Sequence, residues 1–95
     1  MMKAKLGELE STVVEVVRDI TGKLVLLYSR AEDDSVRSQV DIAFSKCAQL
    51  LRNSGKPGVV LALLRELLDY AHRLGVEVDE QLVRRAVELA QELAG

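Results

Sequence analysis

The single histidine of the chain, His72, follows Arg65 by seven positions in the stretch RELLDYAHRLG, residues 65–75. Arginine can hold the charge of a phosphate group, and histidine can transfer protons near neutral pH. Because seven residues span about two turns of an α-helix, a helix would carry both side chains on one side. The pair is therefore the outline of a ribonuclease site. The alternative is two polar residues on the exposed edge of a helix.

The spacing resembles the Arg-x(4–6)-His motif of HEPN-type ribonucleases, which are also α-helical. The resemblance covers only Arg65 and His72, and it implies an arginine that steadies phosphate charge and a histidine that assists proton transfer across a dimer. The chain departs from the family in its length of 95 residues and in Glu66, where a neutral polar residue or aspartate is frequent. The prediction is an exposed helix edge, where His72 lies near the negative end of the helix dipole.

Three other groups of residues do not meet the requirements of a chemical site. Cys47 lies in an apolar stripe, whereas a reactive cysteine needs an exposed, electropositive setting. The acidic residues 32–34 and Asp41 lack the spacing of a calcium loop, and helix capping explains Asp33 and Asp34. The stretch SGKPG has proline where a phosphate-binding loop needs serine or threonine. We therefore predict no catalytic residue, no metal site and no cofactor.

Composition indicates an ordinary globular protein. Apolar residues make up 48% of the chain and charged residues 29%, with a net charge of −2. Basic residues are scattered, and Tyr28, Phe44 and Tyr70 are the only aromatics, so nucleic-acid binding is not indicated. The sequence has one cysteine, no signal peptide and no apolar run approaching the roughly 18 residues of a membrane span. We predict a cytoplasmic protein that does not enter a membrane.

Three breaks divide the chain into four apolar segments: AEDDS at 31–35, RNSGKPG at 52–58 and LGVEVDE at 74–80. The first segment is rich in β-branched residues and could form a hairpin, but its apolar residues recur at helical spacing. We predict a helix over about 4–31. Its apolar face comprises Leu6, Leu9, Val13, Val16, Val17, Ile20, Leu24, Leu27, Tyr28 and Ala31.

The later segments carry the same periodicity and have recognisable ends. Asp33, Asp34 and Ser35 are candidate N-caps of the second helix, and Gly55 suits a left-handed C-cap. Pro57 suits the first position of the third helix, Gly75 ends it, and Asp79 caps the fourth. The expected apolar faces are Val36, Val40, Ala43, Phe44, Cys47, Leu50 and Leu51; Val60, Leu63, Leu64, Leu67, Leu68, Ala71 and Leu74; and Leu82, Val83, Ala86, Val87, Ala90 and Leu93.

Short loops make successive helices antiparallel neighbours. The sequence therefore predicts an all-α protein in which residues 1–95 form one domain, an up-down-up-down four-helix bundle with a long first helix. That helix exceeds the others, and its N-terminal end carries Leu6, Leu9 and Val13 with nothing in the chain left to cover them. Either the helix breaks near Ser11 and Thr12, or a second copy buries the overhang.

The continuous apolar stripe favours the second copy. We predict a non-enzymatic protein–protein interaction module, or a small subunit of a larger complex, that forms a homodimer. The alternative is a HEPN-like ribonuclease with Arg65 and His72 as its site, or an accessory subunit of a nucleic-acid-processing complex. The expected interface residues are Leu6, Leu9, Val14, Val25 and Leu26.

Overall fold

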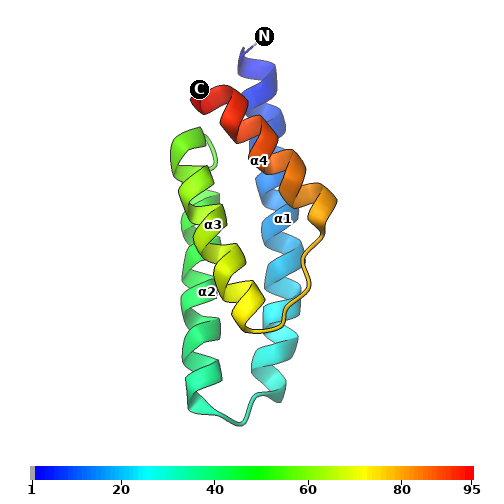
Figure 1. Ribbon diagram of the computed structural model, residues 1–95, viewed down its shortest axis with the longest axis vertical. Helices are drawn as coiled ribbons and strands as arrows, with labels where there is room; N and C mark the ends of the chain where they lie inside the picture. Colours follow the sequence, from blue (N-terminus) through cyan, green and yellow to red (C-terminus); the bar gives the residue numbers. More distant parts are fainter. Residues whose placement is uncertain (1) are drawn as a thin grey trace.

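The computed structural model describes residues 2–95 and confirms the predicted architecture, an all-α up-down-up-down four-helix bundle. The helices are α1 (Met2–Arg30), α2 (Asp34–Arg52), α3 (Pro57–Arg73) and α4 (Glu80–Ala94). Each helix packs against its neighbours in chain order, and α4 closes the bundle against α1 (Figure 1). In the part of the chain that is described, no helix has the length and low charge needed to cross a membrane.

Most helix ends lie where the sequence predicts them. The Asp33 carboxylate accepts a hydrogen bond from the Ser35 amide at 2.8 Å, and Asp79 accepts hydrogen bonds from the first amides of α4. Pro57 is the first residue of α3. Gly75 has a φ of +69°, and the following amide of Val76 donates to the carbonyl of Ala71, which is the Schellman ending of a helix.

The prediction for Gly55 is wrong. Gly75 alone has a positive φ among the described residues, so Gly55 does not adopt a left-handed C-cap. Instead, Asn53 closes α2: both its backbone amide and its side-chain amide donate to the Gln49 carbonyl, at 2.9 and 2.8 Å. Both amides of Asn53 thus converge on one carbonyl of the last turn, and α2 ends without a residue in the left-handed conformation.

The first helix is continuous through Ser11 and Thr12. Thr12 is buried, and its hydroxyl donates to the Glu8 carbonyl one turn earlier, at 2.7 Å. This bond to the preceding turn satisfies the hydroxyl within an unbroken helix, so Thr12 does not cap a helix start.

One face of each helix contributes to a common core, as the helical spacing predicts. The buried apolar residues are Leu9, Val13, Val16, Val17, Ile20 and Leu24 on α1; Val40, Ala43, Cys47 and Leu50 on α2; Val60, Leu63, Leu64, Leu67 and Ala71 on α3; and Ala86, Leu89 and Ala90 on α4.

Three residues depart from the predicted core. Tyr28 is 39% exposed because it lies near the C-terminal end of α1, and Leu51 is 44% exposed in the last turn of α2. Leu89, which the predicted stripe omits, is buried. Because α4 packs against both α1 and α3, it buries a wider face than a single stripe describes.

The N-terminal half of α1 is covered by α4, so the prediction that nothing covers Leu6, Leu9 and Val13 is wrong. Leu9 and Val13 have no exposed surface, and Leu6 is half-buried against the same core. Ion pairs between Lys5 and Glu92 and between Glu8 and Arg85 align α4 antiparallel to this half of α1.

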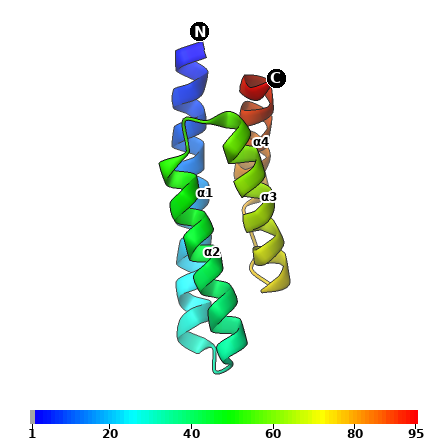
Figure 2. The same cartoon turned by 90° about the vertical axis from the view of Figure 1, so that its left-hand side faces the viewer.

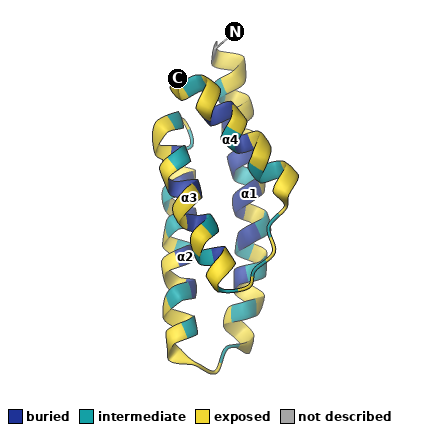
Figure 3. Ribbon diagram, viewed as in Figure 1, coloured by how far each residue is buried: buried dark blue, intermediate teal, exposed yellow. Residues whose placement is uncertain are grey.

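The projecting end of the molecule is the opposite one. The C-terminal end of α1, the turn to α2 and the beginning of α2 extend past the connection between α3 and α4 (Figures 1 and 2). We call this segment, residues 24–42, the distal hairpin. It contributes to the elongated shape of the molecule, which measures 48 × 19 × 17 Å. Most of its residues are exposed (Figure 3). Leu24 and Val40 are buried where α1 and α2 face each other, whereas the apolar side chains on the outer sides of the hairpin, such as Val25 and Leu26, are exposed.

Candidate functional site

Arg65 and His72 both lie on α3 and both are exposed, as the helix-edge interpretation predicts. The rise of a helix separates them by roughly 10 Å along its axis. His72 borders an open hollow of about 560 Å³ between α3 and the connection to α4, but Arg65 does not line it. The two residues therefore do not share a pocket.

The lining of this hollow is unsuited to RNA. Besides His72 it is formed by apolar side chains and by the acidic residues Glu77 and Glu80. Two carboxylates next to the histidine would repel a phosphate group. The adjacent Arg73 pairs with Asp69 at 2.7 Å and lies over the Tyr70 ring. Its guanidinium therefore interacts with residues of its own helix and not with the hollow.

We expect the purified chain to cleave no RNA, because the positive charge and the histidine do not converge on one phosphate position. The measurement is metal-free incubation of a fluorescently labelled single-stranded RNA with the protein at micromolar concentration. Cleavage that disappears in a folded His72→Ala variant would contradict this expectation and restore the ribonuclease interpretation.

Cys47 is placed in the core, as its position in the α2 stripe predicts. It is 3% exposed. Burial raises the pKa of the Cys47 thiol, and a hydrogen bond with Thr21 opposes part of that effect. A raised pKa leaves less of the reactive thiolate at neutral pH, so both burial and protonation make this cysteine inert.

Alkylation should measure this protection. At pH 8, iodoacetamide is expected to modify Cys47 at least about a hundredfold more slowly in the native protein than in urea, because reaction requires the core to open. The matched control is Ser45→Cys in a Cys47→Ala background, since Ser45 is exposed on the same helix. Similar rates for the two cysteines in the native proteins would show that Cys47 is accessible.

The five predicted interface residues do not form one surface. Leu9 is a core residue under α4, and its assignment to an interface is corrected. Leu6 and Val14 are half-buried, whereas Val25 and Leu26 are 54% and 56% exposed. Leu6 and Leu26 are about 30 Å apart along α1. Only Val25 and Leu26, on the distal hairpin, are open to a partner.

Leu26 borders an apolar groove that sequence reasoning missed. The groove has a volume of about 310 Å³ and lies between α1 and the connection from α3 to α4. Leu27, Leu74 and Val76 line it as half-buried side chains, while Lys23, Arg30 and Glu77 provide charge at its walls. The helical wheels assigned Leu27 and Leu74 to the core, and no periodic signal marks Val76.

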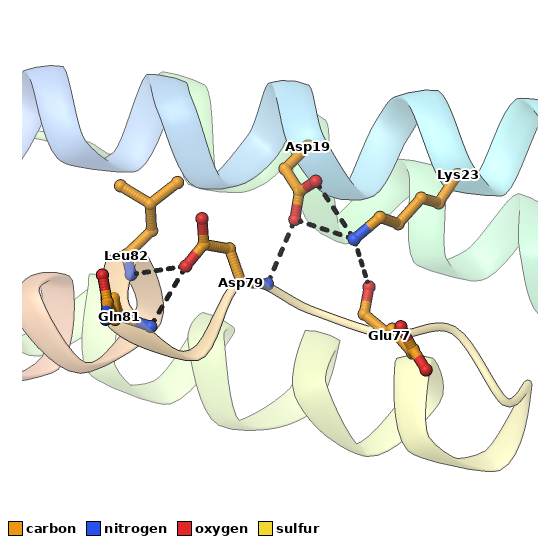
Figure 4. A network of polar contacts seen from close by, with 6 residues as sticks. All are labelled: Asp19, Lys23, Glu77, Asp79, Gln81 and Leu82. Atoms are coloured by element: carbon orange, nitrogen blue, oxygen red, sulfur yellow. Dashed lines mark hydrogen bonds and ion pairs between the residues drawn. The ribbon is translucent and has the colours of Figure 1, made fainter.

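A polar network fixes the wall of this groove (Figure 4). The Lys23 ammonium pairs with the Asp19 carboxylate at 3.1 Å and donates to the Glu77 carbonyl at 2.7 Å. The same carboxylate accepts a hydrogen bond from the Asp79 amide at 3.2 Å. Asp19 and Lys23 therefore attach the connection to α1 well short of the turn between α1 and α2, which leaves the distal hairpin uncovered.

The site is thus an exposed aliphatic side chain, Leu26, at the wall of a preformed apolar groove between the distal hairpin and the connection from α3 to α4, with Val25 exposed on the adjacent side of α1. Such a surface can bind apolar groups of a protein partner. The chain matches no protein-family model, no curated protein and no solved structure at a significant level.

Proposed function

We propose that the chain is a non-enzymatic protein–protein interaction module that binds a second copy of itself through the distal hairpin. The observation that carries the proposal is Leu26, which is 56% exposed at the wall of the groove of about 310 Å³. Its neighbour in the chain, Val25, is 54% exposed. A single exposed aliphatic residue is normal, but Leu26 together with the apolar wall of the groove forms a patch that water solvates poorly. Val25 points about 100° away around the helix and does not line the groove, so it adds exposed apolar surface on the adjacent side of α1.

A second copy is the partner that this surface favours. A twofold axis brings the same patch of each chain together, so both copies are covered at once and the assembly closes as a dimer. Cytoplasmic location is part of the proposal, and the single buried thiol of Cys47 suits a reducing compartment.

Size exclusion with light scattering at tens of micromolar protein should give twice the chain mass of 10.5 kDa. Leu26→Glu is expected to elute as a monomer and to keep its helical circular dichroism, because a charge is readily solvated at this exposed position but not inside an apolar interface. Dissociation should be complete at the same concentration.

The control is Leu51→Glu, which places the same charge on an aliphatic residue that is 44% exposed in the last turn of α2, away from the distal hairpin. This variant should remain a dimer. A strictly monomeric wild-type protein would refute the proposal, and so would a dimer that Leu26→Glu leaves intact.

A further inference from the structure

The charges of the distal hairpin specify how two copies would pair. The turn between α1 and α2 presents three consecutive exposed acidic residues, Glu32, Asp33 and Asp34. Earlier on α1, Arg18 is exposed and joins none of the ion pairs formed within residues 2–95. The neighbouring Asp19 carboxylate is held by Lys23 and the Asp79 amide, so Arg18 is the basic residue on this part of the helix that forms no such pair. Glu15, one turn before Arg18, is exposed and also joins none of these ion pairs.

Arg18 and Leu26 lie on one face of α1, with Gly22 between them. The three residues are four positions apart, so each is displaced about 40° around the helix from the next. A Cβ atom at Gly22 would meet no other atom within 4 Å. The face between the apolar patch and Arg18 is therefore flat and open, and another helix can approach it closely.

Two arrangements would bring the Leu26 side chains of two copies together. If the α1 helices run parallel, the three carboxylates of one turn face the three of the other and repel them. If the helices run antiparallel about Leu26, residue 32 of one copy lies about 9 Å beyond the axis, level with residue 20 of the other. The long side chain of Arg18 spans the remaining two positions.

We infer that two copies pack with the C-terminal halves of their α1 helices antiparallel about Leu26, and that the acidic turn of each copy docks on Arg18 of the other. The inference rests on the proposed self-association and adds its geometry. Twofold symmetry repeats the contact, so the dimer contains two such charge pairs around one apolar centre. Both pairs are at the rim, where they determine orientation and association rate.

A charge exchange tests the arrangement. Glu32 is the acidic residue to change, because Asp33 caps α2 and Asp34 belongs to its first turn. Glu32→Arg and Arg18→Glu should each weaken the dimer about tenfold, since each variant replaces two attractive rim pairs by repulsive ones. The double variant should return to within about threefold of the wild-type dissociation constant, because the pair is restored with its signs reversed.

Sedimentation equilibrium at 50 mM and 500 mM NaCl gives the dissociation constants, and the effects of both single variants should shrink at high salt. The control is Glu88→Arg, the same charge change at an exposed position of α4. It should leave the dissociation constant within about twofold. Circular dichroism should be unchanged for all four variants.

The outcomes separate the two proposals. If the wild type is a dimer that Leu26→Glu dissociates, but the single charge variants have no effect or the double variant is weaker than either, the antiparallel docking is wrong while self-association stands. If the wild type is monomeric, both proposals fail. Rescue by the double variant alone supports the inferred geometry.

Discussion

Leu9→Glu is expected to unfold the protein. Leu9 has no exposed surface, and α4 covers it. An ionised carboxylate at this position would be buried among apolar side chains with no partner, which costs at least about 4 kcal/mol. That cost approaches the whole stability of a small domain, about 5–15 kcal/mol.

Far-ultraviolet circular dichroism and urea titration provide the measurement. The native helical signal should be lost or the urea midpoint should fall steeply. Ser11→Glu is the matched control, because Ser11 lies two residues away on α1 and is exposed; its free energy of unfolding should change by less than about 0.5 kcal/mol. A folded Leu9→Glu monomer would mean that α4 does not cover this half of α1.

Truncation of the central leucines should produce the next largest loss of stability. Leu50 and Leu67 are fully buried on α2 and α3. Leu50→Ala and Leu67→Ala should each lower the free energy of unfolding by about 2–5 kcal/mol, because each removes apolar contacts and leaves a cavity in a packed core.

Chemical denaturation followed by circular dichroism gives these values. Arg65→Ala and His72→Ala are the controls on α3, since both side chains are exposed. Each should change the free energy of unfolding by less than about 0.5 kcal/mol. Equal losses from the leucine and the control variants would show that the helical faces are assigned with the wrong phase.

Local features of the fold could be predicted from the sequence because they depend on neighbours in the chain. The helical repeat of apolar residues identifies the faces that the bundle buries, including Ile20, Leu50 and Leu67. Caps act within a few residues, so Asp33 and Asp79 mark the starts of α2 and α4. The exposed positions of Arg65 and His72 follow from the same periodicity.

The candidate binding surface could be predicted only in part. Val25 and Leu26 lie off the apolar face of α1, and that displacement is visible in the sequence. The groove beside Leu26 was missed because Leu74 and Val76 come from the connection between α3 and α4. No repeat along the chain reports which helix such a connection lies against.

By itself, the sequence determined that this chain forms four amphipathic helices in a bundle, where those helices begin, and which side of each is apolar. Only the tertiary structure decided the axial offset between neighbouring helices, which is how far each helix is displaced along the next. The offset depends on contacts between distant residues: Glu8 with Arg85, and Asp19 with the Asp79 amide. Those contacts cover Leu9 and leave Leu26 exposed. The sequence could not show this, because a helical wheel gives the direction of a side chain around its own axis but not its position along a neighbouring helix.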